Sequence, residues 1–190
     1  MIDIHRLYDI EVAAQSARAL ADKRLTELGI TLERVCDMAL VAMVLTSGTA
    51  DPAPNLMREG VRLAGVLEGS PLCPTILFEQ FDPAVRQRFS IAHELGHYFL
   101  HARRNESSMH IAYQRCDQRR VDAEPASDDA EAGDIETEAD AFAGAFLLPA
   151  DEVRTDLAHF GKCVAFLAER YGVSEATVRR RLRTLKLVLV

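Results

Sequence analysis

Residues 86–101 read RQRFSIAHELGHYFLH and contain the HExxH pentapeptide HELGH at residues 93–97. On an α-helix, residues four apart lie about 40° apart around the axis and one turn along it, so His93 and His97 can direct two imidazoles at one metal ion. Glu94 then lies beside the open coordination position, where it can act as a general base and acid. The motif predicts a zinc-dependent hydrolase built on this helix.

A third metal ligand can come from the later segment GDIETEADAFAGAFLLP, residues 133–149. One face of a helix through this segment carries two acids and small side chains at spacings of three and four: Glu136, Ala139, Asp140, Ala143 and Gly144. Small residues allow this helix to approach the HELGH helix closely, so Glu136 can complete a His, His, Glu site with water as fourth ligand. Asp140, one turn later, can accept the second ring N–H of a ligating histidine. Glu138 projects away and is expected to be solvated.

Two motifs, RxRFSIAHELGHYFLH and ExEADAFAGAFLLP, resemble the ImmA/IrrE family of bacterial and phage metallopeptidases, which belong to the gluzincin group. The resemblance is strong over residues 75–150 and looser in the flanks. It implies a zincin-like domain, with His93, His97 and Glu136 as zinc ligands and Glu94 as the catalytic acid/base.

The resemblance also implies one zinc ion per chain, with manganese as the alternative metal. It implies a protein substrate, namely a transcriptional repressor of helix-turn-helix type, and a role in regulating a mobile element or a stress response. Family members more often carry Asn where this chain has Asp140, a difference that leaves the ligands intact.

Three further side chains are candidates to line the cleft or to stabilise an oxyanion. His101 continues the ladder from His97 but lies a full turn past the metal, so a structural role is favoured. His110 and Tyr113 can supply a donor opposite the metal. The sequence does not choose between them.

Composition is typical of one compact, cytoplasmic protein with a substantial core. The chain has 190 residues, 48% of them hydrophobic, which is enough for a single core. Its four cysteines are widely spaced with no CxxC pair, which argues against a zinc ribbon and against a disulfide scaffold. The N-terminus lacks the apolar run of a signal peptide, and no stretch approaches the length of a membrane span.

Breakers and periodicity predict the order of the first elements. Residues 10–28 favour a helix that stops at Gly29, and Thr31 can cap a second helix running to Leu45. Residues 46–55, TSGTADPAPN, are typical of a loop. These two helices are expected to cover the catalytic domain.

A strand pair and the motif helix should follow. VRLAGVL (residues 61–67) and PTILFE (residues 74–79) predict two strands around a turn. Asp82 and Pro83 are typical of an N-cap and a first helical position. An extended substrate peptide can add to a strand edge near TILFE or to one near residues 109–113. We therefore predict an α+β fold, a small β-sheet packed with helices.

The acid-rich stretch 116–140 contains ten acids and two arginines, a local charge of −8. Most of it is expected to be a solvated loop, and a lid or a steering surface for a basic partner is the alternative.

We predict a metallopeptidase domain over residues 1–150 and a helical segment over residues 151–190 that packs on it. The latter contains LAERYGVSEATVRRRLRTL, which has the layout of a helix-turn-helix with Ser174 as N-cap. Candidate DNA contacts lie on its second helix: Arg179, Arg180 and Arg183. Eight basic and five acidic residues give this segment a charge of +3, against −7 for the chain. That is weak for a DNA-binding domain, so a structural role is favoured.

Three functions from different classes follow from these patterns. The favoured one is a zinc metalloendopeptidase acting on a protein. The alternatives are a zinc-stabilised binding protein that controls a regulator without cutting it, and a DNA-binding regulator that uses the C-terminal helices.

Overall fold

The computed structural model describes residues 2–33, 37–102, 111–116, 129–161 and 163–187. Side chains are described for these ranges except 111–116 and 129–133. The elements follow one another in this order: α1 (Ile4–Glu27), α2 (Met38–Thr46), β1 (Thr49–Ala53), β2 (Met57–Arg58), β3 (Val61–Ser70), β4 (Cys73–Glu79), α3 (Ala84–Leu100), β5 (Ile111–Cys116), α4 (Asp129–Leu147), α5 (Ala150–Phe160), α6 (Val164–Tyr171) and α7 (Glu175–Thr184). This is the mixed α+β fold that the sequence predicts.

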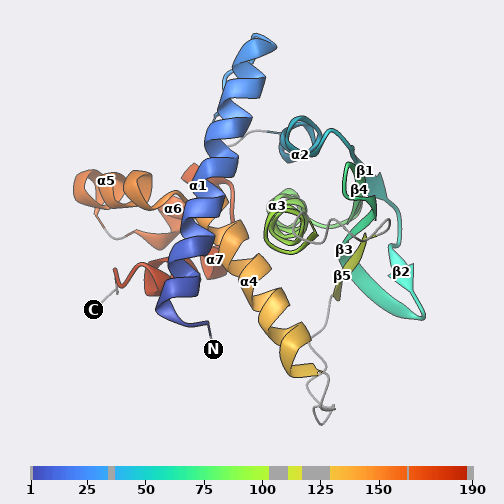
Figure 1. The fold of residues 1–190 in the computed structure, drawn as a ribbon. Coiled ribbons are helices and arrows are strands. Elements are labelled where there is room, and N and C mark those ends of the chain that lie inside the picture. Colours follow the sequence, from blue (N-terminus) through green and yellow to red (C-terminus); the bar gives the residue numbers. More distant parts are fainter. Residues whose placement is uncertain (1, 34–36, 103–110, 117–128, 162, 188–190) are drawn as a thin grey trace.

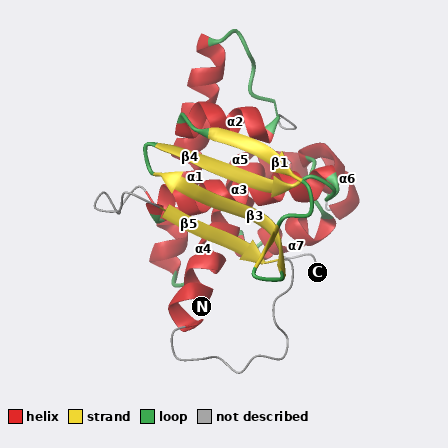
Figure 2. Ribbon diagram, turned by 90° about the vertical axis from the view of Figure 1, so that its right-hand side faces the viewer, coloured by secondary structure: helices red, strands yellow, loops and turns green. Residues whose placement is uncertain are grey.

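One small sheet forms a wall of the molecule, with the described helices behind it (Figure 2). Its strands lie in the order β1, β4, β3, and both β2 and β5 pair with the far side of β3. β1 runs parallel to β4, and the other pairs are antiparallel. The predicted strand pair is confirmed as β3 and β4.

β1 lies inside the stretch that was predicted to be a loop. Thr49 pairs with Thr75 and Ala53 with Glu79 along β4. Pro52 and Gly48 are residues typical of loops, which is why the sequence predicted no strand here. Proline is nevertheless tolerated in a strand at the edge of a sheet, and β1 lies at the edge of the described sheet. The prediction of a loop over residues 46–55 is therefore wrong for residues 49–53, which form β1.

α3 lies in the middle of the fold, between the sheet and the pair α1 and α4 (Figure 1). Because it contacts neighbours on several sides, its central turns are buried all round, with Ala92, Leu95 and His97 at 0% exposed. The HELGH motif thus sits in the hydrophobic core and not on a surface helix.

Two predicted helix starts are displaced. α2 begins after Asp37, whose carboxylate accepts the N–H groups of Ala39 and Leu40, so Thr31 is not its cap. α3 begins one residue later than predicted, with Pro83 at the N-cap position, because the Asp82 carboxylate is engaged with arginine side chains.

The C-terminal helices pack against the rest of the chain. α6 ends at Gly172 in the left-handed conformation (φ 61°), and Ser174 caps α7 by accepting the Thr177 N–H, as the sequence predicts. Arg88 of α3 donates to the Gly172 carbonyl at 3.1 Å. The division of the chain at residue 150 stays a prediction.

Within the described residues, no helix combines the length and the hydropathy that crossing a bilayer requires.

α3 and α4 approach each other most closely at Gly96. A Cβ atom on Gly96 would lie 2.9 Å from the Ala139 Cα, a distance that real Cβ atoms essentially never show, and a tight 3.2 Å from the Phe142 Cβ. Glycine is therefore required here so that the two helices can touch through their backbones. The small-residue face predicted for α4 is the one that makes this contact, with Ala139 and Ala143 fully buried.

Gly96→Ala is expected to destabilise the protein by about 1–3 kcal/mol, since overpacking two helices costs this much and exceeds the gain of about 1 kcal/mol from alanine in a helix. Gly144→Ala on α4 is the matched control, because its Cβ would meet only Arg181 Cδ at 3.9 Å. Urea unfolding of the metal-free proteins checks both. Equal stabilisation by the two alanines would contradict the close contact.

Candidate metal centre

Three side chains from two helices meet at one point. The His93 Nε2 atom lies 3.0 Å from His97 Nε2 and 3.1 Å from Glu136 Oε2, and His97 Nε2 lies 3.0 Å from Glu136 Oε1. All three ligand atoms fall within 4.8 Å of one another. The structure thus brings together the group that the sequence singled out, a geometry able to hold a metal ion.

The two histidines come from deep in α3, while Glu136 comes from the first described turns of α4. His93 and His97 are 1% and 0% exposed, whereas the Glu136 side chain is 42% exposed. The centre therefore opens toward solvent on the Glu136 side. A site closed on one side and open on the other is what a catalytic metal requires, in contrast to a closed structural site.

Asp140 holds the ring of His93 from behind. Its Oδ1 atom lies 2.9 Å from His93 Nδ1, so the imidazole donates there and presents the unprotonated Nε2 to the centre. The second oxygen, Oδ2, accepts from Arg180 Nη1 at 2.5 Å. Asp140 thereby fixes both the tautomer and the orientation of His93.

The protonation states of the centre are those that metal ligands need. Burial lowers the pKa of His97 below its usual 6.5, against the opposing effect of the Glu136 carboxylate. Burial raises the pKa of Glu136, but the close contacts of its carboxylate with the His93 and His97 rings outweigh burial and lower the pKa to about 2. At neutral pH His97 is thus a neutral donor and Glu136 an anion.

Glu94 is fully buried and lies between α3 and strand β3. A Cβ atom on Gly65 would come within 2.6 Å of its Oε1 atom, so the carboxylate occupies the space that a side chain at residue 65 would fill. The pairing of β3 with β5 is irregular at Gly65 as well. Glycine within the strand pattern VRLAGVL is a signal of close approach that could have identified this contact.

His101 lies at the C-terminal end of α3, one turn past the two histidines. Its ring centroid is 5.5 Å from that of His97, and its Nε2 atom is 3.9 Å from Glu138 Oε2. Burial, together with the nearby His97, lowers the pKa of His101 to about 4. The side chain is therefore neutral at physiological pH.

Glu138 is not solvated, contrary to the prediction. Its side chain is 15% exposed, and Arg6 of α1 donates to both of its oxygens at 2.6 and 2.5 Å. The helical spacing placed Glu138 correctly on the face away from the centre. What the sequence did not reveal is that α1 covers that face.

The remaining predicted site residues either lie away from the three ligands or have side chains that the structure does not describe. His110 lies outside the described residues, and Tyr113 lies on β5, where side chains are not described. Arg179 is exposed and pairs with Glu175 at 3.0 Å, and Arg183 is exposed at the end of α7. Arg180 points inward to Asp140 instead. DNA contact by these arginines stays a prediction.

A sequence model of the family described as "IrrE N-terminal-like domain" (Peptidase M78) matches residues 70–183, more than half of the chain. The chain therefore belongs to this family, which supports a metallopeptidase-like role. A search of curated proteins found no match.

Among solved structures, the fold is similar to that of a protein described as a Mycobacterium tuberculosis transcriptional regulator, with a TM-score of 0.54 and 18% identity. The match covers 93% of this chain and 51% of that one, so this chain spans about half the length of the regulator. At this identity the likeness concerns the fold alone.

Stability should fall as the pH is lowered from about 6.5 toward 5, partly because buried His101 resists protonation. Its pKa is lowered to about 4 in the folded protein, so the unfolded chain binds more protons in this window and acid favours unfolding. His101→Gln should flatten the dependence, and His159→Gln, at an exposed position, should not. Urea unfolding of metal-free protein at several pH values measures it. If the free energy of unfolding changed equally with pH in His101→Gln and in wild type, His101 would not be a source of the pH dependence.

Proposed function

We propose that the protein is a zinc metallopeptidase of the gluzincin type, in which His93, His97 and Glu136 bind the metal and Glu94 is the catalytic acid/base. The observation that carries the proposal is the convergence of the three ligand atoms on the open side of a buried HExxH helix. Membership of a peptidase family supports it.

The donor set fits zinc. Two imidazole nitrogens and one carboxylate oxygen, with a position left for water, are the ligands of catalytic zinc sites. Four ligands about 2.1 Å from a tetrahedral ion lie about 3.4 Å apart, close to the 3.0–3.1 Å contacts between the ligand atoms here. Manganese is the alternative, because metal identity depends on supply as well as on ligands. When bound, the metal would supply a Lewis acid that polarises the scissile carbonyl and acidifies water.

Glu94 would do the proton transfer. Helix geometry places it about 60° around α3 from His97, so it can face the same open position. Its carboxylate would accept a proton from the attacking water and return it to the amide nitrogen that leaves, which breaks the peptide bond and frees an amine. The Glu94 carboxylate packs against Gly65, which limits its movement. A fixed carboxylate keeps a constant distance to the reacting water, which favours proton transfer.

The substrate would be a protein segment bound in extended form along β5. Strand β4, which contains TILFE, is paired with β1 on one side and β3 on the other, so it offers no edge for a substrate strand. β5 is paired with β3, and among the described strands none pairs with its other side. A peptide added there would gain main-chain hydrogen bonds, a common mode of peptide recognition.

We further propose that the protein substrate is a transcriptional regulator of helix-turn-helix type, which this peptidase cleaves in the cytoplasm to control a mobile element or a stress response. The resemblance to the ImmA/IrrE family supports this part of the proposal. The C-terminal helices of this chain would pack on the peptidase domain.

Glu136→Ala should remove the metal, since two imidazoles alone do not hold zinc tightly. Glu138→Ala is the matched control, because it removes a carboxylate two residues away on the same helix that pairs with Arg6. Elemental analysis after zinc reconstitution and desalting should find about one zinc per chain in wild type and control, and little in Glu136→Ala. Full zinc content in Glu136→Ala would sink the three-ligand assignment.

Glu94→Gln should keep the metal and lose hydrolysis, because glutamine cannot carry the proton. The zinc-loaded protein would be incubated with a helix-turn-helix regulator encoded beside its gene, and fragments identified by mass spectrometry. Cleavage should require zinc and Glu94, falling by about 100-fold or more in the variant. Undiminished cleavage by Glu94→Gln excludes the mechanism. Tight binding of the regulator without cleavage by any form would favour the binding-protein alternative.

A further inference from the structure

The C-terminal helix reaches the metal centre through a chain of two hydrogen bonds. Arg180 Nη1 on α7 donates to Asp140 Oδ2 at 2.5 Å, and Asp140 Oδ1 accepts from His93 Nδ1 at 2.9 Å. These contacts join residues 40 and 47 positions apart in the sequence. The Asp140 side chain is only 13% exposed, so little water competes for its oxygens.

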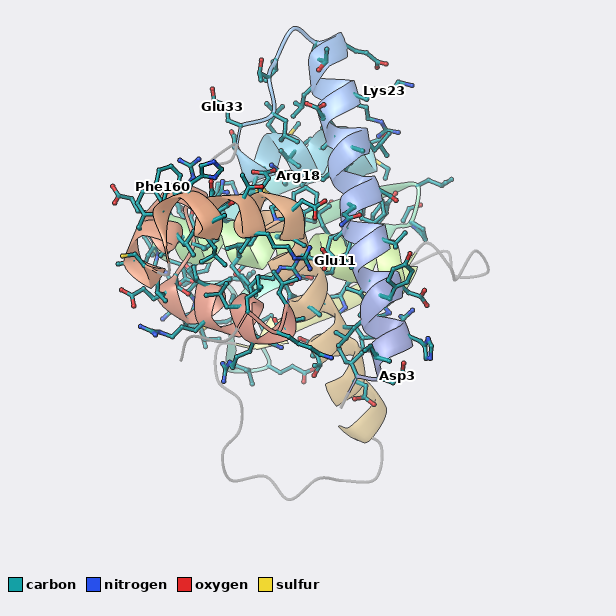
Figure 3. The ribbon with its side chains drawn as sticks, turned by 90° about the vertical axis from the view of Figure 1, so that its left-hand side faces the viewer. Asp3, Glu11, Arg18, Lys23, Glu33 and Phe160 are labelled. Atoms are coloured by element: carbon teal, nitrogen blue, oxygen red, sulfur yellow. The ribbon has the colours of Figure 1, made fainter. Side chains whose placement is uncertain are left out.

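α7 is held firmly enough to present Arg180 in one place. The next residue, Arg181, is buried and donates to the Leu148 carbonyl at 2.9 Å and to both oxygens of Glu11 at 2.8 and 2.7 Å. Figure 3 shows Glu11 on the side of α1 that faces the C-terminal helices. At the other end of α7, Ser174 caps the helix. The backbone that carries Arg180 is therefore fixed against α1 and α4.

We propose that Arg180 is a positioning residue of the metal centre, acting through Asp140 on His93. A carboxylate with one oxygen free can rotate away from the imidazole, whereas one bound at both oxygens keeps its direction. Arg180 thus holds Asp140 in the orientation that presents His93 Nε2 to the metal. This inference rests on the proposed metal site. It gives one arginine of the helix-turn-helix-like segment a role inside the protein.

The positive charge of Arg180 also repels a metal cation, which would weaken metal binding. The test must separate this repulsion from the positioning of His93. Removing Arg180 would lessen long-range repulsion of the metal. The Arg180 side chain is 41% exposed and borders an open hollow of about 230 Å³, so water and salt screen its charge. At 1 M salt the Debye length is about 3 Å, and the positioning effect should then dominate.

The test is the zinc affinity of the full chain, measured in 1 M KCl by competition with a chromophoric chelator. Arg180→Gln should bind zinc about threefold to tenfold more weakly, less than the 10–100-fold cost of losing a direct partner of a ligating histidine. Arg180→Lys should recover part of the loss. Arg179→Gln is the matched control on the same helix, since Arg179 pairs only locally with Glu175 among the contacts described, and it should match wild type.

A double-variant cycle shows whether Arg180 acts through Asp140. In an Asp140→Ala background, Arg180→Gln should cause no further loss of zinc affinity. An equal loss in both backgrounds, or unchanged affinity of Arg180→Gln, would overturn the inference alone. No zinc on the wild type would overturn the proposed function and this inference with it. Melting temperatures of the metal-free proteins detect general unfolding, and the Arg180→Lys variant carries the test if Arg180→Gln does not fold.

Discussion

The candidate site depends on the backbone contact between α3 and α4 at Gly96 and Ala139. Two of the three candidate ligands lie on α3 and the third lies on α4, so the distance between the helices sets the size of the centre. Their atoms come within 3.0–3.1 Å only because no side chain separates the helices at this point. The glycine inside HELGH therefore has a packing role that is distinct from the chemistry of its neighbours.

Charged contacts join α1 to α4, to α5 and to α7. Arg6 binds Glu138 on α4, and Glu11 binds Arg181 on α7. Arg18 reaches α5, and it also lies on the face of α1 toward the C-terminal helices (Figure 3). These pairs are largely buried, so they fix orientation more than they add stability. α1 lies outside the family match over residues 70–183, yet it contacts the helix that carries Glu136.

The sequence predicted the centre better than its surroundings. HELGH and Glu136 could be found because their spacings of three and four residues place side chains on one helical face. The contact of Glu94 with Gly65 and the link from Arg180 to Asp140 join elements far apart in the sequence, and no periodicity encodes them. β1 was missed for a related reason, because local propensity predicted a loop while pairing with the distant strand β4 formed a strand. The Asp37 cap was missed although it is a local signal, since Thr31 offered a second candidate cap.

X-ray absorption spectroscopy of the zinc-loaded protein tests the central claim most directly, because it reports the atoms bound to the metal. We expect a shell of nitrogen and oxygen at about 2.0–2.1 Å with the scattering of two imidazoles. A sulfur shell at about 2.3 Å would show that cysteine binds the metal. That result, or scattering from fewer than two imidazoles, would contradict a centre formed by His93, His97 and Glu136.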